Sequence, residues 1–293
     1  MTDDAPRTPT RAAAHRVTVV SAGRLSPSMV RVTVAGPTLR LIEAPSHTDA
    51  YVKLVFAGHD PDAPWPTLPD GLVDLAAIRA RCAPDHQPRL RSYTVRTFDA
   101  PRAELTFDVV VHGTTGLAGP WAAHAMPGDE LLIVGPGGGY APDPAADWHL
   151  LVGDHSALPA VATALERLAG TAPGARGHAV LEVPDADDEL DLVAPVGITV
   201  HWVHRRGAAA ASGLVRAVQG LAWPPGRVHA FVHGEAGVVR ELRLLLRVDR
   251  RLAKDDLSIS GYWRRGATDE GWRAAKRAWT RSIEDAESAA GLR

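Results

Sequence analysis

The chain has 293 residues, which is longer than a single hydrophobic core usually extends, so the sequence predicts two domains. Its 45% hydrophobic and 23% charged residues are typical of a soluble globular protein, and a formal net charge of −2 excludes a strong attraction of the whole protein to nucleic acid or membranes. The single cysteine, Cys82, excludes an internal disulfide and a cysteine-based zinc or iron–sulfur site within one chain.

The first residues carry no sign of a segment directed to a membrane. Residues 1–16 include Asp3, Asp4, Pro6 and Pro9 and lack a continuous apolar stretch, and no apolar run elsewhere approaches the length of a membrane span. We therefore expect residues 1–14 to be a disordered tail and the protein to be cytoplasmic.

The first half of the chain has the pattern of a small antiparallel β-barrel. Short alternating segments are separated by turn residues, with a break around residues 24–27, a proline-rich loop at 58–69 and one brief helix near 121–125. The expected strands are residues 16–20, 29–34, 50–56, 90–96, 103–113 and 129–135. This arrangement predicts a barrel domain over residues 15–140.

The second half alternates strands with helices. Strands are expected at residues 148–152, 178–183, 198–203, 228–232 and 257–263, and helices at 158–168, 208–219, 237–252 and 270–290. Alternation at this spacing predicts a Rossmann-like parallel sheet with helices on both faces, over residues 147–293. The arginines of the third helix are expected to form a solvated face; they are Arg240, Arg243, Arg247, Arg250 and Arg251.

The strand that contains Arg91, Ser92, Tyr93 and Thr94 carries groups suited to a flat, phosphorylated heterocycle. Tyr93 can stack on a ring, Arg91 can fork onto phosphate oxygens, and the Thr94 hydroxyl can bond a ring nitrogen that gains and loses a proton. An ordinary edge strand with charged outward positions is the alternative interpretation.

A glycine-rich turn follows the next strand. Val111, His112, Gly113 and Gly116 lead into a helix expected to start at about Pro120, where free backbone N–H groups could bind phosphate. A second phosphate site is what a dinucleotide flavin requires. A turn without a ligand is the alternative, because glycine-rich turns commonly precede helices.

Two strand-to-helix crossings of the second half are candidates for binding an electron donor. Gly153, Asp154 and Ser156 stand at the first, and Gly234 and Glu235 at another, and such crossings lie at the carboxyl edge of a parallel sheet where ligands collect. The first crossing lacks a full GxGxxG pattern, and its polar residues could instead cap the helix.

The thirteen histidines are scattered along the sequence. The closest pair, His201 and His204, lies in an expected strand, where a spacing of three directs the two side chains to opposite faces. No metal site is therefore expected.

Together these segments resemble the siderophore-interacting protein family, which are flavin-dependent ferric-siderophore reductases of the ferredoxin-reductase-like superfamily. The resemblance covers nearly the whole chain after about Arg16. The residues that carry it are 91–96, His112-Gly113, Gly116-Leu117-Ala118 with Trp121-Ala122, Gly153-Asp154, residues 157–160, Gly234-Glu235-Ala236 and residues 261–266.

The resemblance implies a ferredoxin–NADP reductase-like architecture with FAD in the N-terminal barrel. It places Arg91 on the diphosphate, Tyr93 against the flavin and Thr94, the implied catalytic residue, near flavin N5. The remaining cofactor-binding residues that it implies are Ser92, Val111, His112, Gly113, Gly116, Ala118 and Gly119. It also implies basic residues that steer an anionic ferric chelate, for which Lys53, Arg264 and Arg265 are the candidates.

The sequence departs from the family pattern at two places. Gly119 stands where the wider superfamily often has Ser or Thr, so diphosphate binding there would use backbone N–H groups. His155 and Ser156 stand where the family often has Glu and Thr, which leaves NADH, NADPH and reduced ferredoxin open as electron donors.

The resemblance implies an enzyme that reduces ferric siderophores and releases Fe(II). A flavin accepts two electrons and passes them on singly, and Fe(II) binds hard oxygen ligands more weakly than Fe(III). Two alternatives stay open: an NAD(P)H–flavin electron-transfer reductase with another acceptor, and a non-enzymatic ferric-siderophore-binding protein.

Overall fold

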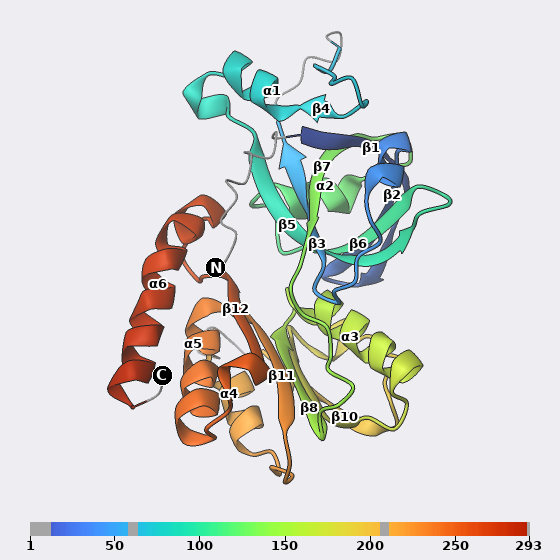
Figure 1. Ribbon diagram of the computed structural model, residues 1–293. Helices are drawn as coiled ribbons and strands as arrows, with labels where there is room; N and C mark the ends of the chain where they lie inside the picture. The colour runs from blue at the N-terminus through green and yellow to red at the C-terminus, as the bar shows by residue number, and fades with distance from the viewer. Residues whose placement is uncertain (1–12, 58–63, 206–210, 292–293) are drawn as a thin grey trace, which may run out of the picture.

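The computed structural model describes residues 13–57, 64–205 and 211–291 (Figure 1). Most of the expected tail, and part of the loop expected at 58–69, lie outside the described residues. Figure 1 shows a barrel above an α/β unit, with the last helix running along the outside of the α/β unit and reaching the barrel at its upper end.

The N-terminal part is an antiparallel sheet that closes on itself. Within the described residues its seven strands run in the order β2-β6-β5-β3-β7-β1-β4, and β1 also pairs with β2. The strands are β1 (Ala13–Ser26), β2 (Met29–Ala35), β3 (Tyr51–Phe56), β4 (Val73–Asp74), β5 (Arg89–Asp99), β6 (Glu104–Val110) and β7 (Glu130–Gly137). The predicted barrel is confirmed.

Period-two patterning explains the barrel core. In β2 the side chains of Val30, Val32 and Val34 are buried, whereas Arg31 and Thr33 between them are half-buried. Helix α2 (Ala118–His124) packs its buried alanines against the same core. It begins two residues before Pro120, the predicted start.

The barrel also differs from the sequence-based expectation in strand β4, in its first hairpin and in an added helix. The predicted break at residues 24–27 is too wide, because Arg24 still pairs with Val30 in the β1–β2 hairpin. Helix α1 (Leu75–Arg81) was not expected; Asp74 caps it by accepting from Ala76 N at 2.9 Å and Ala77 N at 3.0 Å. Short 3₁₀ turns lie at Pro37–Leu41 and Pro84–His86.

The C-terminal part is the predicted parallel sheet, with strand order β10-β9-β8-β11-β12. Its strands are β8 (Trp148–Asp154), β9 (Arg176–Val183), β10 (Gly197–His204), β11 (Val228–Glu235) and β12 (Leu257–Trp263). Its helices are α3 (Leu158–Thr171), α4 (Ala211–Gln219), α5 (Ala236–Leu244) and α6 (Asp269–Ala289), and 3₁₀ turns lie at Ala186–Asp188 and Lys254–Asp256. Helix α3 covers one face, and α4 and α5 cover the other (Figure 1). The predicted fold class is confirmed.

The two parts are joined by direct contacts. Asp188 Oδ1 accepts hydrogen bonds from Ser26 Oγ at 2.6 Å and Ser28 Oγ at 2.7 Å, which ties the β1–β2 turn to the α/β part. From β5, the Arg96 guanidinium reaches Thr163 Oγ1 at 2.5 Å and Glu166 Oε1 at 2.6 Å on α3. Met29 of the barrel is fully buried in the apolar cluster of α3. These contacts fix the position of β5 relative to the parallel sheet.

Helix α6 is attached through a buried ion pair. Arg243 of α5 donates two hydrogen bonds to Glu287 at 2.6 and 2.8 Å, and Arg247 Nε lies 3.7 Å from the same carboxylate. The expectation of a solvated face is therefore wrong for Arg243 and Arg247, which are 8% and 6% exposed. A π-helical turn (Leu245–Asp249) ends the helix predicted over 237–252.

Within the described part of the chain, no helix has both the length and the apolar character needed to cross a membrane.

We predict that Glu287→Ala lowers the free energy of unfolding by about 3–5 kcal/mol, because it leaves two buried guanidinium groups without their carboxylate. Thermal unfolding and amide exchange along α6 measure the effect. Glu284→Ala, on the exposed side of the same helix, is the matched control and should stay within about 0.5 kcal/mol of the parent.

The same ion pair predicts a pH dependence. Burial raises the pKa of the Glu287 carboxyl, but hydrogen bonds and charge from Arg243 lower it more, so its folded pKa lies below the usual range. The stabilisation is therefore fully present above the unfolded pKa of about 4.3 and is lost as the pH falls through the lower folded value. The stability difference between the parent protein and Glu287→Gln should shrink below about pH 4. A difference that stays constant down to pH 2 would contradict the assignment.

Candidate functional site

An aromatic row connects β5 to α2. The ring of Tyr93 lies 6.1 Å from that of Phe107 in β6, and Phe107 stacks on Trp121 of α2 at 6.4 Å with an interplanar angle of 22°. Phe107 is fully buried, whereas Tyr93 and Trp121 are half-buried at the rim of the barrel core. Burial raises the pKa of the Tyr93 phenol above its usual range.

The neighbours of Tyr93 in the sheet supply a hydroxyl and a cation. Thr94 is 6% exposed and pairs with Tyr51 of β3, and Ser92 is exposed and pairs with Lys53. The Lys53 ammonium lies 6.0 Å from the centre of the Tyr51 ring. The structure thus brings Lys53, Ser92, Tyr93 and Thr94 together on adjacent strands.

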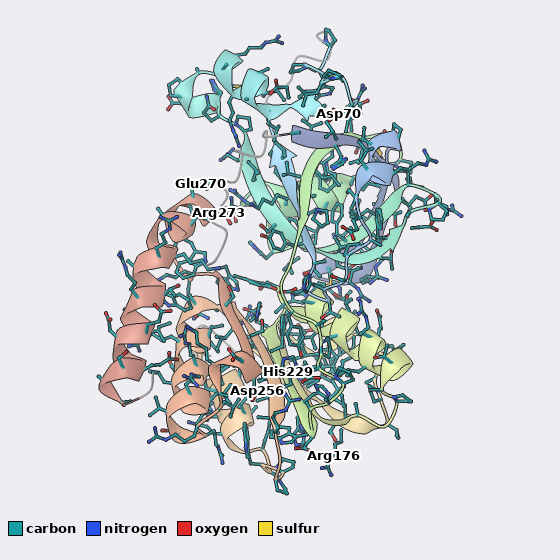
Figure 2. The ribbon with its side chains drawn as sticks, viewed as in Figure 1. Asp70, Arg176, His229, Asp256, Glu270 and Arg273 are labelled. Atoms are coloured by element: carbon teal, nitrogen blue, oxygen red, sulfur yellow. The ribbon has the colours of Figure 1, made fainter. Side chains whose placement is uncertain are left out.

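Arg91 is held by the first turn of α6. Its guanidinium donates to Glu270 Oε1 at 2.7 Å and to Asp269 Oδ2 at 3.3 Å, and Arg273 of the same helix donates to Leu90 O at 3.0 Å. Figure 2 shows Glu270 and Arg273 at the end of α6 that faces β5. A cleft of about 320 Å³ opens between this turn and residues 84–90. An anion that binds Arg91 would therefore compete with two carboxylates of the chain itself.

Sequence reasoning missed these two carboxylates. Thr268 caps α6 by accepting from Gly271 N, and acidic residues follow in the first turn, which is a common start signal for a helix. That signal locates the start of the helix, but it carries no information on its contact with β5.

The turn after β6 is open. Gly113 and Gly116 have φ values of +61° and +93°, and no atom lies within 4 Å of the position that a Cβ would take at either residue. His112 is exposed, and Val111 packs against the barrel core while its N–H donates to Ser28 O at 2.8 Å. A ligand can therefore approach the backbone of this turn closely.

Helix α2 starts after this turn with no side-chain cap, and its first residue, Ala118, is buried. Gly119 lies inside the helix, where a Cβ would come 3.3 Å from Val110 O. A side chain at this position would press on the backbone of β6. The open turn, the uncapped helix start and the aromatic row form one continuous set, and they fit a flavin dinucleotide.

At the carboxyl edge of the parallel sheet, Asp154 joins three strands. Its Oδ1 accepts from Ser156 N at 2.9 Å and Ser156 Oγ at 2.6 Å, and its Oδ2 accepts from Glu235 N at 2.8 Å and Trp263 Nε1 at 2.7 Å. Gly234, with φ +147°, permits this approach, because a Cβ there would lie 2.7 Å from Asp154 Oδ2. The carboxylate links the ends of β8, β11 and β12.

Glu235 completes the same edge. Its Oε2 accepts from Gly237 N at 2.6 Å and Val238 N at 3.0 Å, which caps α5, and its Oε1 accepts from Arg265 N at 3.1 Å. Gly153 packs directly on Ala157, so a Cβ there would come 2.8 Å from that side chain. The residues predicted to bind the donor are thus brought together, but their polar groups bond to one another.

The two basic residues predicted for the chelate follow β12 directly, and both Arg264 and Arg265 are exposed. Tyr262 before them packs edge-on against His233 at 4.9 Å, and burial raises the pKa of Tyr262.

The histidines of β10 have separate partners: His201 bonds His178 at 3.1 Å, and His204 bonds Glu189 at 2.6 Å. Among residues 13–57, 64–205 and 211–291, no three His, Cys, Asp or Glu residues are grouped as metal ligands would be.

Comparison with known families accounts for both halves of the chain. The model of the siderophore-interacting FAD-binding domain matches residues 18–140, and that of the siderophore-interacting protein matches residues 146–266. The chain belongs to the siderophore-interacting protein family. The resemblance predicted from the sequence is confirmed.

Relatives and solved structures agree with this membership. An uncharacterized protein of Mycobacterium tuberculosis is 44% identical over 94% of this chain and 97% of its own length. Ferric vibriobactin reductase ViuB of Vibrio cholerae is 34% identical over 85% of this chain and 88% of its own. The crystal structure of a siderophore utilization protein from T. fusca has a TM-score of 0.73 and 36% identity, covering 87% of this chain and 94% of that chain. Siderophore-interacting proteins thus share this architecture along nearly its full length.

We predict that Asp154→Asn lowers the free energy of unfolding by about 3 kcal/mol, because an amide cannot accept all the hydrogen bonds that the carboxylate accepts. Hydrogen exchange at the Glu235 amide should also become faster. Asp191→Asn, which changes an exposed carboxylate of the same domain, is the matched control. Unchanged exchange at Glu235 would show that the contact contributes little.

Proposed function

We propose that this protein is an FAD-dependent reductase that takes electrons from NAD(P)H or reduced ferredoxin and passes them to a ferric siderophore, releasing Fe(II). The observation that carries the proposal is the continuous set of Tyr93, Phe107 and Trp121 with the open glycine turn beside it, in a barrel of the siderophore-interacting FAD-binding family. The reductase activity named for ViuB supports the same conclusion.

The residues on β5 and those in the turn after β6 would bind different parts of FAD. Tyr93 would support the flavin ring, Thr94 would offer its hydroxyl to N5, and Arg91 would bind the diphosphate after exchanging Glu270 for phosphate oxygens. The contacts along the ribityl chain and diphosphate would come from Ser92, Val111, His112, Gly113, Gly116, Ala118 and Gly119. FAD supplies a two-electron store that releases electrons singly.

Binding of the ferric chelate, the electron acceptor, would depend on positive charge. Lys53, Arg264 and Arg265 would attract an anionic ferric chelate and raise its local concentration. The two arginines are exposed, and Lys53 is half-buried on β3. One-electron reduction of Fe(III) to Fe(II) weakens binding to hard oxygen donors, so the metal is released. The side chains thus bind and orient, and no side-chain acid or base is required.

The function is tested with the purified protein. We expect a yellow protein with flavin absorbance that, under anaerobic conditions with an electron donor, yields trapped Fe(II) from ferric hydroxamate, catecholate or citrate chelates. A colourless protein that cannot be reconstituted with FAD would overturn the proposal. A flavoprotein that reduces none of the three chelates would favour a reductase with another acceptor.

The partner exchange at Arg91 predicts opposite effects of two substitutions. Arg91→Ala removes a charged donor and should weaken FAD binding about tenfold or more, and Tyr93→Ala should act in the same direction. Glu270→Gln removes the competing carboxylate and should strengthen FAD binding. Fluorescence titration of the apoprotein with FAD measures each Kd. Glu284→Gln, elsewhere on α6, serves as the control, and full FAD occupancy in both Arg91→Ala and Tyr93→Ala would refute the site.

The acceptor site predicts a separate loss. Lys53→Ala and Arg264→Ala should retain FAD but trap Fe(II) more slowly, and the difference from the parent should shrink with added salt because screening weakens the attraction. Arg281→Ala removes an equal charge from the exposed side of α6 and should leave the rate unchanged. Equal rates in all three variants would show that the chelate binds elsewhere.

A further inference from the structure

Helix α6 brings one lysine against the outer strand of the parallel sheet. Lys276 Nζ donates to Ser260 Oγ of β12 at 2.9 Å, and the lysine side chain is half-buried. Trp272, one turn earlier on α6, packs on the other face of β12, where a Cβ on Gly261 would come 2.9 Å from its ring. Since β12 is the edge strand of the sheet, Lys276 reaches past this edge to the face that carries Ser260.

The Lys276 ammonium lacks a counter-charge. The acidic residues at the start of α6 pair with arginines: Asp269 Oδ2 lies 2.7 Å from Arg273 Nε. Glu270 Oε1 accepts from Arg91 at 2.7 Å. Within the described residues Lys276 forms no ion pair, and burial together with the charge of Arg273 lowers the pKa of its ammonium. A half-buried cation without a carboxylate is costly to keep charged, so this arrangement favours an anionic ligand.

The same face of β12 carries hydroxyl groups. Ser258, Ser260 and Tyr262 alternate along the strand, so they face one side, and all three are half-buried. His233 of β11 lies against this row, with Nε2 3.0 Å from Ser258 Oγ. Burial and the charge of Lys276 lower the pKa of His233 to about 3, so this imidazole is uncharged at neutral pH. The face thus combines neutral hydrogen-bonding groups with the Lys276 ammonium.

The row of hydroxyl groups leads to the first arginine after β12. Four residues separate Ser260 from Arg264, which corresponds to about 13 Å at the usual rise of a strand. Between them, burial raises the pKa of Tyr262, and the charge of Asp49, just before β3 of the barrel, raises it further. The row therefore borders the barrel. Lys276 stands at one end of it and Arg264 at the other, so both side chains can contact one chelate.

We propose that Lys276 is a specificity-determining residue that binds the oxygen atoms of an anionic ferric chelate, so that trianionic catecholate complexes bind more tightly than uncharged hydroxamate complexes. Ser260 is a positioning residue, because its hydroxyl holds the ammonium against β12. The matched family model ends at residue 266, before α6, so the family match does not include Lys276. A ferric chelate as the ligand rests on the proposed function, whereas the preference for an anion depends on the uncompensated ammonium alone.

Gallium(III) chelates test binding without electron transfer, because gallium(III) has the charge of Fe(III) and is not reduced. The probes are the gallium complexes of a hexadentate tricatecholate, which is trianionic, and of a hexadentate trihydroxamate, which is uncharged. The parent protein should bind the first more tightly than the second. Lys276→Met should weaken binding of the tricatecholate about tenfold or more and leave the trihydroxamate within about twofold. Isothermal titration calorimetry measures each Kd.

Arg277→Met is the matched control, because it removes an equal charge from the exposed neighbour of Lys276. It should leave both affinities within about twofold of the parent. Equal losses in Lys276→Met and Arg277→Met would overturn the proposal, since only the overall charge would then matter. An equal loss of both chelates in Lys276→Met would also overturn it, because damage to the fold explains a loss that ignores the charge of the ligand.

A measurement on the parent protein decides if Lys276→Met does not fold. The lysines of the sequence are Lys53, Lys254 and Lys276, so acetylation of each amine can be followed separately by mass spectrometry. The gallium tricatecholate should slow acetylation of Lys276 and leave that of the exposed Lys254 unchanged. An unchanged rate at Lys276 under saturating chelate would overturn the proposal.

Both readouts are separate from the test of reductase activity. A protein that binds the gallium chelates with this preference but traps no Fe(II) would contradict the proposed reductase and retain the role of Lys276. A protein that traps Fe(II) from ferric chelates, but whose affinity for the gallium tricatecholate is the same in the parent and in Lys276→Met, would retain the reductase and overturn the role of Lys276.

Discussion

The carboxylate of Asp154 is the contact on which the α/β half depends. This buried side chain at the end of β8 receives N–H and O–H donors from the turn that follows it and from the ends of β11 and β12, so the ends of three strands are held in a fixed relation. Gly234 is required for these contacts, since any side chain there would displace the Asp154 carboxylate. The motifs at the two strand-to-helix crossings, which resemble a ligand-binding edge, therefore also hold the strand ends together.

In the barrel half, the corresponding turn is open instead of internally bonded. Its glycines at 113 and 116 face open space, and its short helix α2 begins without a side-chain cap. This turn and helix start lie next to Trp121, which continues the row of rings through Phe107 to Tyr93, and Tyr93 and Trp121 are half-buried. Polar groups that bond to one another favour rigidity, as at the strand ends of the α/β half. The barrel turn is thus open, whereas the edge of the parallel sheet is internally bonded.

Periodicity and turn residues were sufficient to predict most of the architecture. The bounds of β12, Leu257–Trp263, agree with the prediction because the strand alternates and is bounded by turn signals. Arg243 was assigned to solvent because a local pattern cannot reveal that Glu287, 44 positions later, covers it. The saturation of Asp154 was beyond prediction for the same reason, since its partners lie 2, 81 and 109 positions away. Local signals identified the motifs, and long-range contacts decided what those motifs do.

The pairing of Arg91 with α6 has a consequence for the order in which the molecule is completed. Arg91 and its acidic partners are separated by 178 and 179 positions. At about 5–20 residues per second, a ribosome needs roughly 10–40 seconds to make the intervening chain. During that interval the barrel can fold with the Arg91 guanidinium lacking these two carboxylates. The nascent protein therefore passes through a stage at which the surroundings of Arg91 are more positive than in the finished molecule.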